Sequence, residues 1–216
     1  MKDATLLFVL AVLLFAASCG QVGTISQPPP PPLPTPLPPN VTAAADPQGD
    51  AGPTPTWDIV ELRSERGLTT LDIRLWLTTD PILPAPGSLA GAGDMMFQIG
   101  FNSDLSRSTG TSFGFQCASA AGQGLDFMID GGFVGPRNSN GTFNLRRTTG
   151  GLPIVGPVTA SQSGPYVTFT VQYSAFGGTF AGRSEVIALV GFGPPGAPSW
   201  RDCAPDAGQA LPTRRD

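Results

Sequence analysis

The sequence predicts an all-β domain, a two-sheet antiparallel β-sandwich that follows a signal peptide and a proline-rich linker. Several segments alternate apolar and polar residues with a period of two. Turn-forming residues separate these segments, and the chain holds 28 glycines and 24 prolines. No window of the domain has a convincing helical period, and only 13% of the residues are charged. These observations favour short strands joined by many turns.

The clearest strand lies at 71–77, where leucine and isoleucine alternate with polar residues and so leave one face to be buried. An unbroken apolar run at 186–192 predicts a strand buried on both faces. The other predicted strands lie at 57–63, 95–102, 112–117, 125–130, 143–145, 154–158 and 166–173. Roughly eight or nine strands at this spacing favour a jelly-roll-like sandwich, with a closed barrel as the alternative.

The N-terminus has the pattern of an export signal. An apolar run, Leu6–Phe15, follows Lys2 and is too short for a membrane span, which takes about 20 residues. The small residues that follow, Ala16–Ser18 before Cys19, resemble a lipobox, although that family usually has Leu where Ala16 stands. The resemblance implies cleavage before Cys19, acyl chains such as palmitate on Cys19, and stable anchoring in a membrane. The alternative is an ordinary secretory peptide.

The residue after Cys19 is Gly20 rather than an Asp, and in this the chain is similar to lipoproteins that are sent on to the outer membrane or cell surface. The proline run that follows, Pro28–Pro39, cannot join a helix or a central strand and predicts an extended stalk of about 37 Å. The alternative is a ligand for a proline-recognising module. The expected organisation is a signal peptide at 1–18, a lipidated tether at 19–45, a β-domain at 46–208 and a disordered tail at 209–216.

Composition excludes several functions. The net charge of −4 gives no basic surface for nucleic acid, and no glycine-rich phosphate loop opens a helix to bind a nucleotide. The chain has no histidine, which excludes histidine-dependent triads and histidine-ligated zinc. Outside the reducing cytosol, Cys117 and Cys203 are expected to form a disulfide, with two separately buried thiols as the alternative.

A series of short motifs resembles the β-sandwich modules of bacterial surface proteins that are related to DOMON and carbohydrate-binding modules. The motifs are DPQGD at 46–50, Asn102-Ser103-Asp104 followed by Thr109-Gly110, GLDF at 124–127 and DCAPDAG at 202–208. The resemblance implies a β-sandwich with a binding or a structural role, and it does not imply one particular activity. Asn102 departs from the family's Asp and weakens any cation site there.

Calcium is the one metal that the composition still allows, because it takes oxygen ligands that include carboxylates. Aspartates gather near both ends of the domain, and a sandwich can bring its two ends together. We therefore predict a structural calcium clasp as the only cofactor; the alternative is that these aspartates lie in solvated turns. The four candidate ligands are Asp46, Asp50, Asp202 and Asp206.

Trp76 and Tyr166 fall on the polar faces of their strands and are candidates for stacking against sugar rings, with packing as the alternative. Asp126 and Asp130 would lie about 13 Å apart on one strand, too far for either mechanism of glycoside hydrolysis. The sequence thus predicts a non-enzymatic, membrane-anchored binding protein whose partner is a carbohydrate or an envelope protein. The alternatives are a purely structural envelope module and a degenerate hydrolase.

Overall fold

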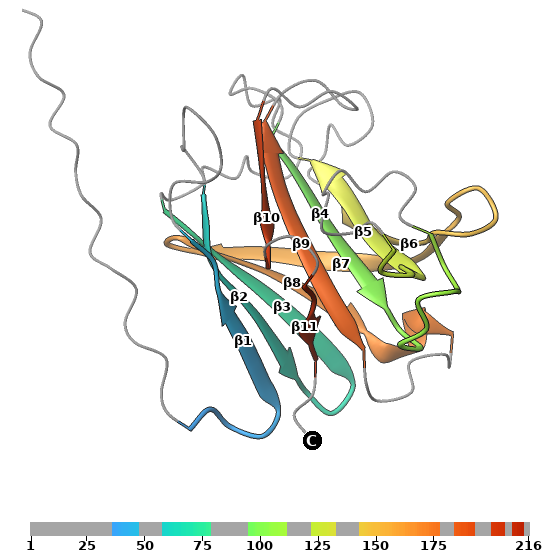
Figure 1. Ribbon diagram of the computed structural model, residues 1–216, viewed down its shortest axis with the longest axis horizontal. Helices are drawn as coiled ribbons and strands as arrows, with labels where there is room; N and C mark the ends of the chain where they lie inside the picture. Colours follow the sequence, from blue (N-terminus) through green and yellow to red (C-terminus); the bar gives the residue numbers. More distant parts are fainter. Residues whose placement is uncertain are drawn as a thin grey trace, which may run out of the picture.

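The computed structural model describes residues 36–47, 58–78, 95–111, 122–132, 143–177, 184–192, 200–205 and 209–213. This part of the chain is built from antiparallel strands, which confirms the predicted all-β class (Figure 1). The strands are β1 (Val41–Ala45), β2 (Ile59–Arg66), β3 (Thr70–Leu77), β4 (Met95–Asn102), β5 (Phe127–Gly132), β6 (Phe143–Arg147), β7 (Ile154–Ser163), β8 (Tyr166–Gln172), β9 (Glu185–Phe192), β10 (Trp200–Ala204) and β11 (Leu211–Pro212).

A 3-10 turn, η2 (Tyr173–Phe176), follows β8 and ends where Gly177 adopts a left-handed conformation with φ 65°. No helix within the described ranges is long and apolar enough to cross a membrane.

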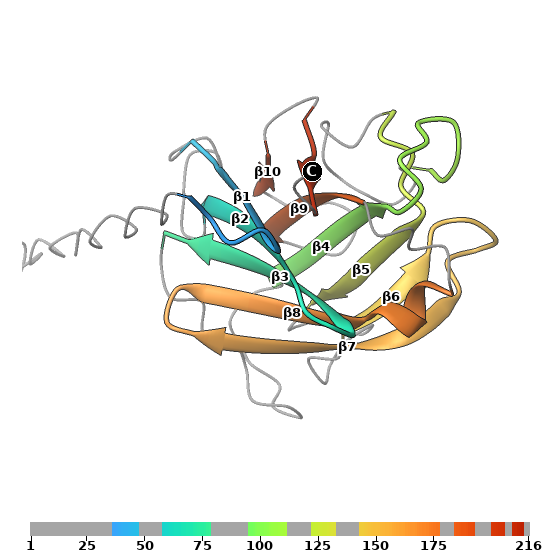
Figure 2. The same ribbon diagram turned by 90° about the horizontal axis from the view of Figure 1, so that it is seen from below.

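The strands follow one hydrogen-bonded path in the order β1-β2-β3-β8-β7-β6-β5-β4-β9-β10, and β11 pairs with β9. The long strand β7 joins the two halves of this path. Its first residues pair with β6 and its last residues, Thr159–Ser163, pair with β8. Two faces of one bent sheet are therefore opposed, with β7 and β8 on one side and β4, β5 and β9 on the other (Figure 2).

The two ends of the path approach each other, so the sheet is nearly closed. The Oδ2 atom of Asp202 in β10 accepts a hydrogen bond from the amide of Ile59 in β2, at 2.5 Å. The hydroxyl of Thr42 in β1 donates to the carbonyl of Pro212 in β11. These side chains join strands that make no backbone ladder with each other. We call this junction the seam.

The core lies between the opposed faces. The four apolar residues of β3 predicted to point inward, Leu71, Ile73, Leu75 and Leu77, are fully buried. Phenylalanine rings fill the centre, where Phe143 and Phe169 meet edge to face with their centroids 5.0 Å apart. Every residue from Val186 to Val190 is fully buried, because Ile187 and Leu189 pack into a second, smaller cluster on the other face of β9. The prediction of a strand buried on both faces is confirmed.

Three strands have no counterpart in the sequence-based prediction, namely β1, β10 and β11. The sheet therefore includes residues placed in the tether (19–45) and in the tail (209–216), on either side of the predicted domain of 46–208. β1 carries alanine at three of its five positions, so its sequence lacks the large apolar residues that make alternation visible. The predicted strand at 112–117 lies outside the described residues.

Candidate functional site

The exposed side of the β2-β3-β8-β7 half carries a face of polar and aromatic side chains, which we call the polar sheet face. The antiparallel register aligns its residues in rows across the strands. One row consists of Glu61, Trp76, Tyr166 and Ser163. The next row consists of Arg63, Arg74, Thr168 and Ser161. Side chains from four strands are thus brought into one surface.

Trp76 and Tyr166 are direct cross-strand neighbours, with ring centroids 4.9 Å apart and planes tilted by 46°. Trp76 is only 6% exposed, whereas Tyr166 is partly exposed. The indole packs beside the phenol, and at 6% exposure it offers little surface for stacking. Of the two predicted ligand-binding residues, Tyr166 is the one that a ligand could reach.

The guanidinium groups of Arg63 and Arg74 occupy paired positions on β2 and β3, where like charges repel. Arg63 is neutralised by Glu61, since its Nε lies 2.9 Å from the carboxylate. Arg74 lies with its guanidinium carbon 6.0 Å from the centre of the Tyr166 ring and forms no ion pair with any described residue. It can therefore donate hydrogen bonds to an acceptor beside Tyr166.

Burial raises the pKa of Tyr166 above its usual value of 10.0, and the negative charge of Glu61 raises it further. Arg63 and Arg74 oppose this rise in the pKa. The phenol is therefore neutral at physiological pH and can both donate and accept a hydrogen bond.

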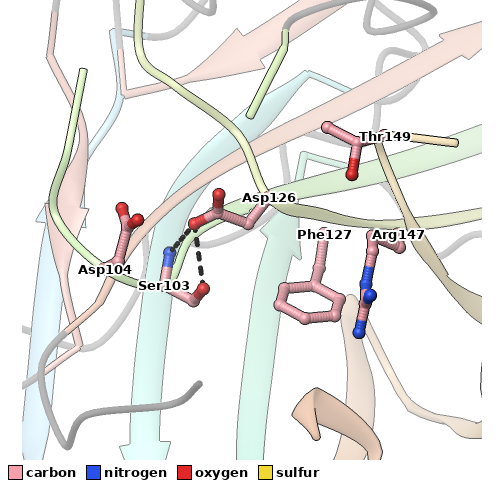
Figure 3. Close-up of a pocket in the computed structure, with 6 residues that line it drawn as sticks. All are labelled: Ser103, Asp104, Asp126, Phe127, Arg147 and Thr149. Carbon is pink, nitrogen blue, oxygen red and sulfur yellow. Dashed lines mark hydrogen bonds between the residues drawn. The ribbon is translucent and has the colours of Figure 1, made fainter. Parts of the chain in front are cut away.

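A cavity of about 250 Å³ lies at the end of the sheet where β4 and β6 finish and β5 begins (Figure 3). Its lining residues are Ser103, Asp104, Asp126, Phe127, Arg147 and Thr149. Phe127 belongs to the core and forms the apolar part of the wall, while the other lining residues are polar. Small-molecule sites have this composition, an apolar surface with a few convergent polar groups.

Two loops that pack backbone against backbone form one side of the cavity. Gly124 has φ 64°, and a Cβ atom there would lie 2.2 Å from the carbonyl oxygen of Ser106. Only glycine permits this approach. The side-chain amide of Asn102, fully buried, donates to the carbonyl of Gln123 at 2.8 Å and joins the same two loops.

The acidic side of the cavity has two carboxylates that differ in the hydrogen bonds they accept. Asp126 Oδ2 accepts hydrogen bonds from the amide and the hydroxyl of Ser103, at 2.8 and 2.9 Å. Asp126 Oδ1 accepts none from the described residues (Figure 3). Both oxygens of Asp104 accept from the hydroxyl of Thr109, and one also accepts from the amide of Ser106, so its carboxylate stabilises its own loop.

The basic side of the cavity is Arg147, whose guanidinium carbon lies 5.8 Å from the centre of the Phe127 ring. Arg147 is exposed, and it forms no ion pair with the carboxylates beside it or with any other described residue. Figure 3 shows the ring of Phe127 between Asp126 and Arg147. The cavity is therefore lined by opposite charges that are held apart.

The structure brings two of the four predicted calcium ligands to adjacent residues of β2. The amide of Asp46 donates to the carbonyl of Val60, and Asp202 accepts from Ile59. Asp202 Oδ1 also accepts from the amide of Cys203, so amide donors engage both of its oxygens. Asp50 and Asp206 lie outside the described residues. Within the described ranges no group of three or more histidine, cysteine, aspartate or glutamate residues could hold a metal ion, and the clasp stays a prediction.

The cysteines predicted to be modified or paired are mostly beyond the described part of the chain. Cys19 and Cys117 lie outside it, whereas Cys203 lies in β10, partly buried against the second apolar cluster. The Cys117–Cys203 disulfide and the acylation of Cys19 stay predictions. Asp130, weighed for hydrolysis, is in β5, while Asp126 precedes that strand.

Sequence reasoning did not identify Arg74, Arg147 or Thr149 as site residues. Arg74 could have been found, because the alternation in β3 places it on the same face as Trp76. Arg147 and Thr149 had no such signal, since only the β5–β6 pairing brings them beside Asp126.

No model of a known protein family matches this chain, and no curated protein matches it either.

Proposed function

We propose that this protein is a lipid-anchored component of the cell envelope or cell surface whose β-domain binds a carbohydrate or an envelope partner without catalysis. The observation that carries the binding proposal is Tyr166, which is partly exposed on the polar sheet face and packs against the ring of Trp76. Arg74 lies beside the ring, and Thr168 is the cross-strand partner of Arg74.

This combination suits a sugar. An aromatic ring offers an apolar surface to the C–H groups of a sugar ring, while the phenol, guanidinium and hydroxyl groups can bond to sugar hydroxyls. Because strands hold these groups in register, they need little reordering when a ligand binds. Exposed serines on β7 extend the face beyond Tyr166.

Membrane attachment is supported by the sequence pattern that ends at Cys19 and by the proline run after it. Acyl chains on Cys19 would hold the protein at the membrane, and the stalk would raise the domain above it. The polar sheet face could then meet a polymer of the envelope.

The binding proposal is tested by screening the full chain, purified in detergent, on a glycan array with calcium and again with chelator. Tyr166→Ala should abolish binding to the captured glycan, whereas Gln172→Ala, exposed on the same face at the far end of β8, should leave it unchanged. Trp76→Phe should weaken binding only through the support that it gives to Tyr166.

If no glycan is bound with or without calcium, or if Tyr166→Ala binds as well as the wild type, the carbohydrate proposal fails. The alternative is then a structural or assembly module of the envelope. In that case, covalent cross-linking in envelope preparations should capture a defined protein partner, and Arg74→Ala should reduce this capture.

One observation favours hydrolysis as a second candidate: the carboxylates of Asp104 and Asp126 line one cavity. Glycosidases need two carboxyl groups, one of which donates a proton. Here the oxygens of Asp104 and Oδ2 of Asp126 accept hydrogen bonds from amides or hydroxyls, which suits binding better. Release of reducing sugar that disappears in both Asp104→Asn and Asp126→Asn would establish the hydrolase.

A further inference from the structure

The cavity at the end of β4, β5 and β6 lies on different strands from the Tyr166 surface, and it holds an unusual charge arrangement. Asp126 and Arg147 line the same small space but do not form an ion pair with each other. Opposite charges in one cavity attract, so something must hold them apart.

Each charge is held by its own contacts. Ser103 fixes Asp126 by two hydrogen bonds to Oδ2, which leaves Oδ1 without a donor among the described residues. The Arg147 guanidinium lies against the Phe127 ring, and its Nη2 atom lies 3.7 Å from where a Cβ on Gly177 would be. Phe127 stands between the two charges, as Figure 3 shows.

Asp126 Oδ1 can accept from a cation, and the guanidinium of Arg147 can donate to an oxyanion in two parallel hydrogen bonds. Thr149 adds a hydroxyl to the wall of the same cavity. A ligand that carries an ammonium and a carboxylate a few bonds apart would satisfy both sides at once. The volume of about 250 Å³ lies below the range of drug-sized sites and admits only a small molecule.

We propose that this cavity binds a free α-amino acid, with its ammonium group on Asp126 Oδ1 and its carboxylate on Arg147. The Phe127 ring forms the apolar wall that a short side chain would face. The inference does not depend on carbohydrate binding at Tyr166, because the two sites share no residue.

Isothermal titration calorimetry on the full chain in detergent tests the proposal, with glycine, alanine and serine as probes. Singly charged analogues, propionate and alanine amide, are the matched controls. We expect the amino acids to bind with millimolar or better affinity and each analogue to bind at least about tenfold more weakly, since each loses one charge-assisted contact.

Two variants assign the contacts. Asp126→Asn keeps an acceptor for Ser103 but removes the charge, so it should lose amino-acid binding by at least about tenfold. Arg147→Gln changes an exposed side chain and should have the same effect, while Gln172→Ala should bind like the wild type. The melting temperature of each variant shows whether the fold is retained.

Absence of heat with every amino acid, from a wild-type chain that melts cooperatively, overturns the proposal. Equal affinity for propionate and alanine overturns the assignment of a zwitterion. Unchanged affinity in Asp126→Asn or Arg147→Gln overturns the placement of the ligand in this cavity. None of these outcomes bears on the glycan screen, so the two proposals fail separately.

Discussion

The two tyrosines of the chain, Tyr166 and Tyr173, show how local surroundings set the chemistry of one side chain. Burial is the largest cause that raises the pKa of each phenol. Arg66 opposes the rise at Tyr173, with its guanidinium carbon 5.2 Å from the ring centre. Both phenols therefore stay neutral at a higher pH in the folded protein than in the unfolded chain.

This shift predicts a loss of stability in alkali. The unfolded chain ionises its tyrosines near pH 10.0, so the stabilising contribution is complete below that pH and is lost as the pH rises toward the higher folded values. The free energy of unfolding, measured with urea, should fall between pH 8 and pH 11. It should fall less steeply in a Tyr166→Phe, Tyr173→Phe double variant. Absorbance of tyrosinate, from these two residues alone, should titrate above pH 10; titration at or below that value contradicts the shift.

At the scale of the element, the alternation of apolar and polar residues identified strands, but it did not show which strands pair with each other. The pattern in β3 predicts its buried face because large apolar residues occupy every second position. The pairing of β3 with β8 joins segments far apart in the chain, and no local pattern encodes it. This pairing sets Tyr166 beside Trp76 with their rings in contact, and the tryptophan on the predicted polar face is only 6% exposed.

The seam is an element-level feature with a measurable contribution. Asp202 bonds the amide of Ile59 through a buried carboxylate that is 4% exposed. Asp202→Ala should lower the free energy of unfolding by about 1–3 kcal/mol, because the buried amide then lacks its acceptor. Asp202→Asn, which retains an acceptor oxygen, should lose less. Urea denaturation measures both changes, and equal loss in the two variants would show that the charge matters more than the hydrogen bond.

The same denaturation, with calcium and with chelator, tests the predicted clasp of Asp46, Asp50, Asp202 and Asp206. A calcium-dependent rise in the wild-type melting temperature that disappears in Asp202→Ala is the expected result for a bound ion. An unchanged melting temperature would count against a bound calcium ion and leave the Asp202 carboxylate as the acceptor of hydrogen bonds from the amides of Ile59 and Cys203.

At the scale of the whole molecule, the all-β class follows from composition and alternation, whereas the near closure of the sheet does not. Closure depends on β10 and β11, short strands whose few residues carry no clear period. The cavity could not be predicted from the sequence either, because its charged residues come from three separate stretches of chain. Sequence reasoning could propose only residues with a local signal, such as Tyr166 and Asp202, and their roles as ligand-binding and calcium-binding residues stay predictions.

The proposed membrane attachment has its own test. Cys19→Ser should abolish incorporation of labelled palmitate and move the protein from the membrane fraction to the soluble fraction. Gly20→Ala, which leaves the cysteine in place, is the control and should remain at the membrane. Retention of Cys19→Ser in washed membranes would mean that something other than acyl chains holds the protein there.

The way the chain enters the sheet has a mechanical consequence. Asn40 and Arg66 exchange two hydrogen bonds, from the Arg66 amide to the Asn40 carbonyl and from the Asn40 side chain to the Arg66 carbonyl. Any tension on the N-terminal segment is therefore delivered first to this clamp and then to β1, an edge strand rich in alanine. Peeling β1 from β2 would also break the Thr42–Pro212 bond of the seam, but it would remove only the partly buried Ala44 from the main core. β1 would therefore yield under load before the surface around Tyr166 is disturbed.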